Sequence, residues 1–113
     1  MDIYHIWCDK AGDMEDTVWV GFMEKFFDRL VKEKRMVKYR ITRMKLGFRS
    51  IADLPEWHIM CEFKNLDQLD KCFGRVATKE GKLEQHHKSF NQYVGPNIHH
   101  ALYRDWPDQG LNI

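Results

Sequence analysis

Alternation of hydrophobic and polar residues along the chain predicts four β-strands. They cover residues 2–8, 36–46, 57–63 and 98–104. The first and third strands share one pattern, an aromatic residue followed by His, Ile, a large apolar residue and Cys, at 4–8 and again at 57–61. A histidine among apolar neighbours therefore occurs twice, at the same place in two strands.

Hydrophobic residues spaced three and four apart predict three helices between these strands. The first is expected to begin near Met14, after an acidic cap at Asp13, and it carries an apolar stripe at Trp19, Phe22, Met23, Phe26 and Leu30. Asn65, with Gln68 three places on, is expected to cap the second helix, whose stripe consists of Leu66, Leu69, Phe73 and Val76. The third covers 82–94, and the Gly-Pro-Asn sequence at 95–97 is expected to end it.

The order of these elements predicts one α+β domain over residues 1–113, with an irregular tail at 105–113. Strand, helix, strand, then strand, two helices and strand is the order of a ferredoxin-like βαββα(α)β sandwich with a four-stranded antiparallel sheet. The first and third strands are central in that fold and are related by a pseudo-twofold axis. The repeated pattern would then occupy equivalent positions on these two strands.

The two faces of the predicted sheet differ in polarity. The more apolar face, expected to pack against the helices, consists of Tyr4, Ile6, Cys8, Val37, Tyr39, Ile41, Trp57, Ile59, Cys61, Phe63 and Leu102. The opposite face carries Ile3, Trp7, Met44, Met60, Ala101 and Tyr103 beside His5, Arg40, Thr42, His58 and Glu62. Burial of one Trp or Met side chain contributes about 1.5–3 kcal/mol, so this second face is too apolar to stay in water. We expect a homodimer in which two sheets pack face to face and form an eight-stranded barrel.

Five stretches of the chain carry a resemblance to a known superfamily. They read MDIYHIWCD at 1–9, YRITRMKLG at 39–47, WHIMCEFKNLDQLD at 57–70, RVATKEG at 75–81 and ALYRDWPD at 101–108. The chain resembles the dimeric α/β-barrel superfamily and, within it, a group of small uncharacterised bacterial proteins. The resemblance implies the fold and the homodimer. The superfamily includes cofactor-independent monooxygenases, haem-degrading enzymes, lactone isomerases and stress-responsive proteins, so it assigns no catalytic residue to this chain.

The overall charge and the cysteines restrict the partners and the compartment. A formal net charge of +1 over 113 residues argues against nucleic acid or an anionic membrane as a partner. No apolar run approaches the ~20 residues that a membrane-spanning helix needs. The three cysteines form no CxxC motif, and the first residues do not resemble a signal peptide. A cytoplasmic location is expected.

The candidate chemistry lies mainly on the second face of the sheet. The candidate catalytic residues are His5, His58, Arg40 and Tyr103, and the further candidate binding residues are Trp7, Met60, Glu62, Arg43 and His87. A histidine beside a carboxylate can act as a general base near neutral pH. The structural alternative, which the residues favour, is that both histidines are hydrogen-bonded within the dimer interface.

A metal site and a cofactor are not expected. The adjacent pairs His86-His87 and His99-His100 point in different directions whether they lie on a helix or a strand, so neither pair chelates easily.

Two hypotheses for the function remain. The first is a small-molecule pocket, between sheet and helices or at the barrel mouth, with the superfamily suggesting a cofactor-independent monooxygenase or isomerase if it is catalytic. The second is a non-catalytic, stress-related or structural dimer. An enclosed cavity with convergent polar groups would separate them.

Overall fold

A computed structural model describes residues 1–107 of the chain. Its elements, in order, are β1 (Asp2–Lys10), α1 (Asp16–Lys32), β2 (Lys38–Arg43), β3 (Trp57–Phe63), α2 (Leu66–Ala77), α3 (Gly81–Asn91) and β4 (Val94–Arg104). The strands form one antiparallel sheet in the order β2-β3-β1-β4. The predicted ferredoxin-like α+β fold is therefore confirmed.

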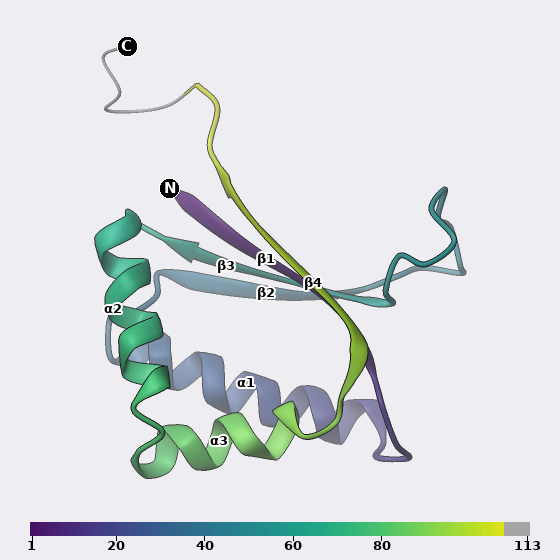
Figure 1. Ribbon diagram of the computed structural model, residues 1–113, viewed down its shortest axis with the longest axis horizontal. Helices are drawn as coiled ribbons and strands as arrows, with labels where there is room; N and C mark the ends of the chain where they lie inside the picture. The colour runs from purple at the N-terminus through teal and green to yellow at the C-terminus, as the bar shows by residue number, and fades with distance from the viewer. Residues whose placement is uncertain (108–113) are drawn as a thin grey trace.

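All three helices lie on one side of the sheet (Figure 1). The core between the two layers is centred on Trp19, which is fully buried and donates its indole N–H to the carbonyl oxygen of Phe90 at 3.0 Å. On β3 the odd-numbered residues 57, 59, 61 and 63 are all buried and the even-numbered ones are half-buried, as the alternation predicts.

We call the other side of the sheet the open face, since no helix among residues 1–107 covers it. Its side chains are Ile3, His5, Trp7, Lys38, Arg40, Thr42, His58, Met60, Glu62, His99, Ala101 and Tyr103.

The register of the central strands accounts for the repeated pattern. Ile6 of β1 lies opposite Ile59 of β3, and these are the middle residues of the two copies. A pseudo-twofold axis through this pair relates each residue of one copy to its counterpart in the other. His5 and His58 are one such pair of counterparts, and both side chains point to the open face.

Two predicted boundaries near the start of the chain are wrong. Helix α1 begins at Asp16 rather than near Met14, and its N-cap Glu15 makes no side-chain cap. The Asp16 carboxylate is instead held by Lys10 at 3.4 Å and Arg43 at 3.1 Å, which fixes the first helical turn to the sheet. Strand β2 is shorter than the expected 36–46, because positive φ angles at Leu46 (53°) and Gly47 (65°) turn the chain away from the sheet.

The end of the chain departs further from expectation. Helix α3 covers Gly81–Asn91, not 82–94, and the Gly-Pro-Asn sequence lies inside β4, which begins at Val94 rather than at 98. Pro96 is tolerated there because β4 is an edge strand, where a missing backbone N–H leaves no neighbour unpaired. The same edge position leaves Leu102, expected in the core, 47% exposed. Part of the expected irregular tail, beyond residue 107, lies outside the described residues.

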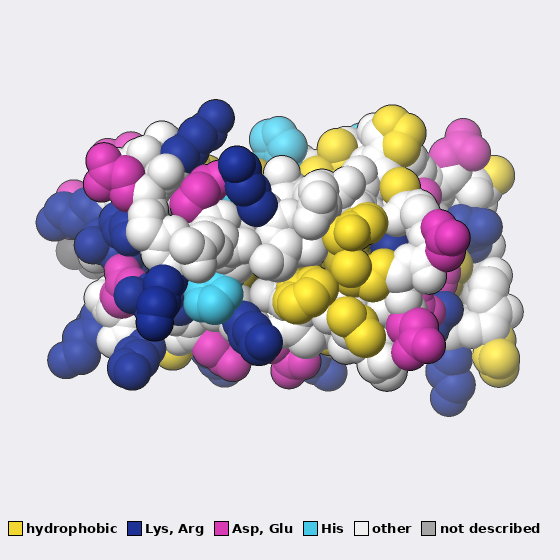
Figure 2. Space-filling view, turned by 90° about the horizontal axis from the view of Figure 1, so that it is seen from below, with side chains coloured by type: hydrophobic (Ala, Val, Ile, Leu, Met, Phe, Trp, Pro, Cys, Tyr) yellow, Lys and Arg dark blue, Asp and Glu magenta, His cyan; other side chains and the backbone are white. Residues whose placement is uncertain are grey.

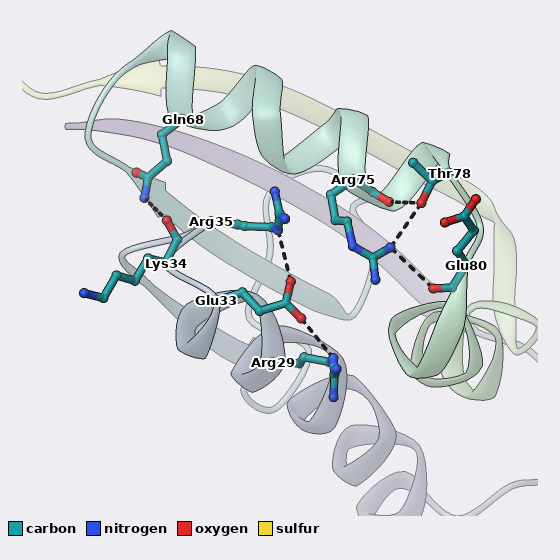
Figure 3. Close-up of polar contacts among 8 residues, drawn as sticks. All are labelled: Arg29, Glu33, Lys34, Arg35, Gln68, Arg75, Thr78 and Glu80. Atoms are coloured by element: carbon teal, nitrogen blue, oxygen red, sulfur yellow. Dashed lines mark hydrogen bonds and ion pairs between the residues drawn. The ribbon is translucent and has the colours of Figure 1, made fainter.

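Separate polar contacts lie at the end of α1, between that end and α2, and in the turn that follows α2 (Figure 3). Glu33 accepts from Arg35 and also lies 3.0 Å from Arg29, while Gln68 at the start of α2 donates to the carbonyl of Lys34. The hydrogen bond from Arg35, and then the charges of the nearby arginines, lower the pKa of the Glu33 carboxyl. Asn65 accepts from the backbone N–H of Gln68, which confirms the predicted cap of α2.

The outer surface of the helical layer differs in character from one end to the other. Lysine and arginine side chains surround one end of this face, and hydrophobic side chains gather nearer the other (Figure 2). Over residues 1–107, none of the helices is both long enough and apolar enough to cross a membrane.

Gly95 provides a test of how β4 meets β1. The two strands lose their regular register between Cys8 and Lys10, and a Cβ atom at position 95 would lie 3.0 Å from the carbonyl oxygen of Asp9. Because the contacted atom belongs to the backbone, we expect Gly95→Ala to lower the free energy of unfolding by about 1–3 kcal/mol, the usual range for overpacking. Urea unfolding measures the change. Gly74→Ala is the matched control: it adds a Cβ on α2 with no atom within 4 Å, and should stabilise by about 0.5–1 kcal/mol. Equal stability of the Gly95 variant and the wild type would contradict this account.

Candidate functional site

The two histidines of the repeated pattern meet on the open face. His5 Nδ1 and His58 Nε2 lie 2.8 Å apart and are hydrogen-bonded. The register places His5 opposite Met60 and His58 opposite Trp7, so the histidines are diagonal neighbours across two antiparallel strands. The bond requires one ring nitrogen to donate and the other to accept, so at least one imidazole must be neutral. Burial lowers the pKa of both imidazoles, and the charge of His5 lowers that of His58 further.

Two aromatic side chains complete a histidine–aromatic cluster, which we define as His5, Trp7, His58 and Tyr103. The Trp7 ring stacks on His58 with centroids 4.7 Å apart and planes at 6°, and it lies 5.5 Å from His5. The Tyr103 ring meets His5 edge-on at 4.7 Å. Such contacts each contribute about 0.5–1.5 kcal/mol beyond area burial. The four side chains of the cluster therefore pack tightly against one another. Tyr103 itself is 57% exposed in the single chain.

Of the other candidates on the sheet, Met60 adjoins the cluster because it lies opposite His5, whereas Glu62 and Arg43 pair with residues outside it. Met60 and Arg40 are cross-strand neighbours on the open face. Glu62, suggested as a partner for the histidines, is paired instead with Lys38 at 3.6 Å. Arg43 points to the helix side, where it lies over the Trp57 ring and forms ion pairs with Asp16 and Glu56 at 3.1 and 3.0 Å.

A cavity lies between the sheet and the helices, on the opposite side from the histidine–aromatic cluster. Its volume is about 390 Å³, within the usual range for small-molecule sites. The walls are mostly apolar and come from β1, β3, β4 and all three helices, and include Tyr4, Ile6, Phe26, Cys61, Phe73, Val76, His87 and Asn91. We call this space the sheet–helix cavity.

His87 is the ionisable imidazole in the wall of the sheet–helix cavity. Its ring packs against Phe26 at 4.9 Å and Phe90 at 5.6 Å. Burial lowers its pKa; Glu84 opposes this effect and Lys79 adds to it. Among residues 1–107 no other group forms a hydrogen bond with this imidazole. A neutral, half-buried imidazole in an apolar wall can accept or donate one hydrogen bond to a ligand, or accept a proton from it.

The thiols in the cavity wall are poor nucleophiles. Burial raises the pKa of Cys72 to about 11 and that of Cys61 to about 12. Both cysteines are therefore protonated near neutral pH. Since only the thiolate is strongly nucleophilic or a good metal ligand, neither thiol is suited to either role. Within residues 1–107 the structure holds no group of three or more His, Cys, Asp or Glu side chains arranged to bind a metal.

Sequence reasoning found the cluster but only one residue of the cavity. His5, His58, Trp7 and Tyr103 are together, as their shared face predicts, whereas His87 lies in the sheet–helix cavity away from them. The remaining wall residues read in the sequence as ordinary core positions. Asn91, a polar residue at the end of α3, is the one signal that could have extended the list.

Comparison with known proteins identifies a family and a fold. A family model described as "Family of unknown function (DUF6614)" matches residues 1–112. No curated protein matches the chain. Among the similar solved structures is a dimeric ferredoxin-like protein of unknown function from Jannaschia sp. CCS1, with 13% identity, coverage of 93% of this chain and 100% of that chain, and a TM-score of 0.65. Another is the cofactor-independent oxygenase SnoaB from Streptomyces nogalater, with 6% identity, coverage of 96% of this chain and 97% of that chain, and a TM-score of 0.66. A third is a dimeric ferredoxin-like protein of unknown function from Bacteroides fragilis, with 13% identity, coverage of 92% of this chain and 96% of that chain, and a TM-score of 0.55. At these identities the likeness shows the fold.

Burial of His5 and His58, which lowers the pKa of both imidazoles, predicts a loss of stability in acid. A histidine in the unfolded chain has a pKa of about 6.5, and both folded values are lower. The unfolded state therefore binds more protons as the pH falls through this value, so the free energy of unfolding decreases. Urea unfolding at pH 7.5 and 5.5 should show the decrease. The double variant His5→Asn, His58→Gln keeps amide groups near both nitrogens and should show a smaller difference. An unchanged difference would assign the acid sensitivity to other groups.

Proposed function

Since the chain belongs to the DUF6614 family, a family of unknown function, we propose a function from its own geometry: a homodimer that binds a small, largely apolar organic molecule in the sheet–helix cavity. The observation that carries the proposal is the 390 Å³ space with an imidazole in an otherwise mostly apolar wall. Such cavities combine hydrophobic walls with a few polar groups that orient the ligand. We further propose that His87 provides the hydrogen bond that orients this ligand.

The dimer is proposed to form through the open face. Several apolar and aromatic side chains lie there without a helix over them, and Tyr103 is 57% exposed in the single chain. Two of the similar structures are described as dimeric, which supports the same assembly here. In this arrangement the histidine–aromatic cluster serves the interface. That role agrees with the short contact between its histidines, which leaves no room between them for a ligand.

If the bound molecule is also transformed, His87 is the proposed general base. Burial favours its neutral form, which is the form that can accept a proton near neutral pH. The similarity in fold to SnoaB, described as a cofactor-independent oxygenase, supports chemistry without a bound cofactor, by analogy of fold alone. The three buried, unpaired cysteines support a reducing compartment such as the cytoplasm.

Light scattering tests the dimer. Purified protein at micromolar concentration should have twice the mass of one 13.6 kDa chain. His5→Glu should shift the mass towards that of one chain, because it buries a carboxylate at the centre of the proposed interface, and the cost of removing that charge from water exceeds what a hydrogen bond from His58 returns. Glu24→Gln, on the exposed side of α1, is the control and should leave the dimer intact. A wild-type protein with the mass of one chain would refute the proposed assembly.

Two matched ligands test the sheet–helix cavity and His87 separately. Naphthalene and 1-naphthol differ by one hydroxyl group, and binding of both is measured by fluorescence. His87→Leu should leave naphthalene binding nearly unchanged and weaken 1-naphthol binding by about five- to tenfold, the effect of one lost hydrogen bond. Val76→Trp narrows the cavity and should weaken both ligands at least tenfold.

Val18→Trp is the control for this pair of measurements, since Val18 lies on the outer side of α1 and is 43% exposed. It should bind both ligands as the wild type does. If neither ligand binds, or if Val76→Trp and Val18→Trp behave alike, the sheet–helix cavity is not the binding site.

A further inference from the structure

The segment between β2 and β3 carries two unusually exposed hydrophobic side chains. We call residues 44–56 the arm. Leu46 is 93% exposed and Phe48 is 94% exposed. The arm extends beyond the end of the sheet, on the opposite side of the molecule from α2 (Figure 1). Side chains of this kind contribute nothing to the stability of a single chain, because water surrounds them in the folded and the unfolded state alike.

The arm is nevertheless held in a defined shape. The N–H of Phe48 donates to the carbonyl of Lys45 at 2.9 Å, and the Arg49 guanidinium donates to the carbonyl of Leu54 at 2.6 Å. At its base the N–H of Glu56 donates to the Asp9 carboxylate at 2.8 Å. Leu46 adopts a φ of 53°, a conformation that a leucine rarely adopts. A strained and braced backbone therefore holds the two side chains outward.

A hollow of about 550 Å³ lies between the arm and the open face. It is lined largely by apolar groups, among them Trp7, Met44, Leu54 and Pro55, by His58, and on the arm side by Leu46 and Phe48 of the same chain. Trp7 and His58 belong also to the histidine–aromatic cluster, so the hollow continues directly from the surface proposed as the dimer interface. One end of the molecule thus presents both projecting apolar side chains and an apolar recess.

A twofold interface joins the same patch on both subunits, so each patch must be complementary to itself. The arm and the recess meet this requirement, because a projecting arm on one chain can fill the recess on the other. We propose that the 44–56 arm is a clasp between subunits: Leu46 and Phe48 of each chain pack over the open face of the partner and close the hollow lined by Trp7 and His58. This inference rests on the proposed homodimer.

The clasp gives a role to Leu46 and Phe48, whose exposure has no function in a single chain. The hollow is incomplete in one subunit and becomes an enclosed chamber at the barrel end only when the partner's arm covers it. A second copy is the favoured occupant over an unrelated protein or a lipid surface. The proposed homodimer already places a second chain over Trp7 and His58, and these residues line the hollow beside the arm.

Sedimentation velocity across a dilution series tests the clasp. The double variant Leu46→Ser, Phe48→Ser should raise the dimer dissociation constant at least 100-fold, since buried aromatic anchors dominate most interfaces. Both side chains are exposed in the single chain, so the fold should persist, as circular dichroism can check. Leu66→Ser is the control: Leu66 is 59% exposed on α2, on the helix side, and its substitution should leave the constant unchanged.

The outcomes separate the clasp from the dimer itself. A monomeric wild type overturns both, whereas a wild-type dimer that tolerates the arm variant overturns only the clasp. In a second measurement, a photoreactive benzoylphenylalanine at position 48 should join two chains covalently on illumination. Cross-linking within one chain only would overturn the clasp. So would binding of wild-type protein, but not the arm variant, to phosphatidylcholine vesicles with the dimer unaffected.

Discussion

A four-stranded sheet has two faces, and the helices of this chain pack against only one of them (Figure 1). The helix side buries Trp19, Phe63 and their neighbours and makes the core. The open face holds aromatic and apolar side chains together with two histidines, and hydrophobic surface of that extent requires a cover. The order β2-β3-β1-β4 places the most apolar strands, β1 and β3, at the centre of both faces. The core, the cavity and the proposed interface all follow from this division.

The sequence alone was sufficient for the features that depend on local periodicity. Alternation along 57–63 predicted which side chains of β3 are buried, and the shared pattern at 4–8 predicted that His5 and His58 lie on one face. Once Ile6 lies opposite Ile59, the two histidines become diagonal neighbours and can form a hydrogen bond. Local pattern and strand pairing agree here, so the inference held.

Features that depend on tertiary context were missed. Gly95 and Pro96 have strong turn propensity, but the chain places them in an edge strand where neither the missing N–H nor the missing side chain is costly. The cavity depends on the distance between the helices and the sheet. In the sequence its wall residues Phe26, Phe73 and Val76 are simply apolar residues at helical spacing. Periodicity cannot show whether such residues fill the space between two layers or leave part of it empty.

Adjacent residues of the central strands face different surfaces, and this separates the two proposed roles of the chain. On β1 the odd-numbered His5 and Trp7 face outward, while the even-numbered Tyr4 and Ile6 line the sheet–helix cavity. On β3 the parity is reversed, with His58 outward and Cys61 inward. A one-residue slip of either strand would exchange the side chains of the proposed interface for those of the cavity, so the register has to be specified strongly. The Ile6–Ile59 pair, buried or half-buried at the centre of the repeat, supports that register from the core side. The repeated aromatic–His–Ile pattern therefore encodes both surfaces at once: the isoleucines hold the two strands in register, and the register brings the histidines together.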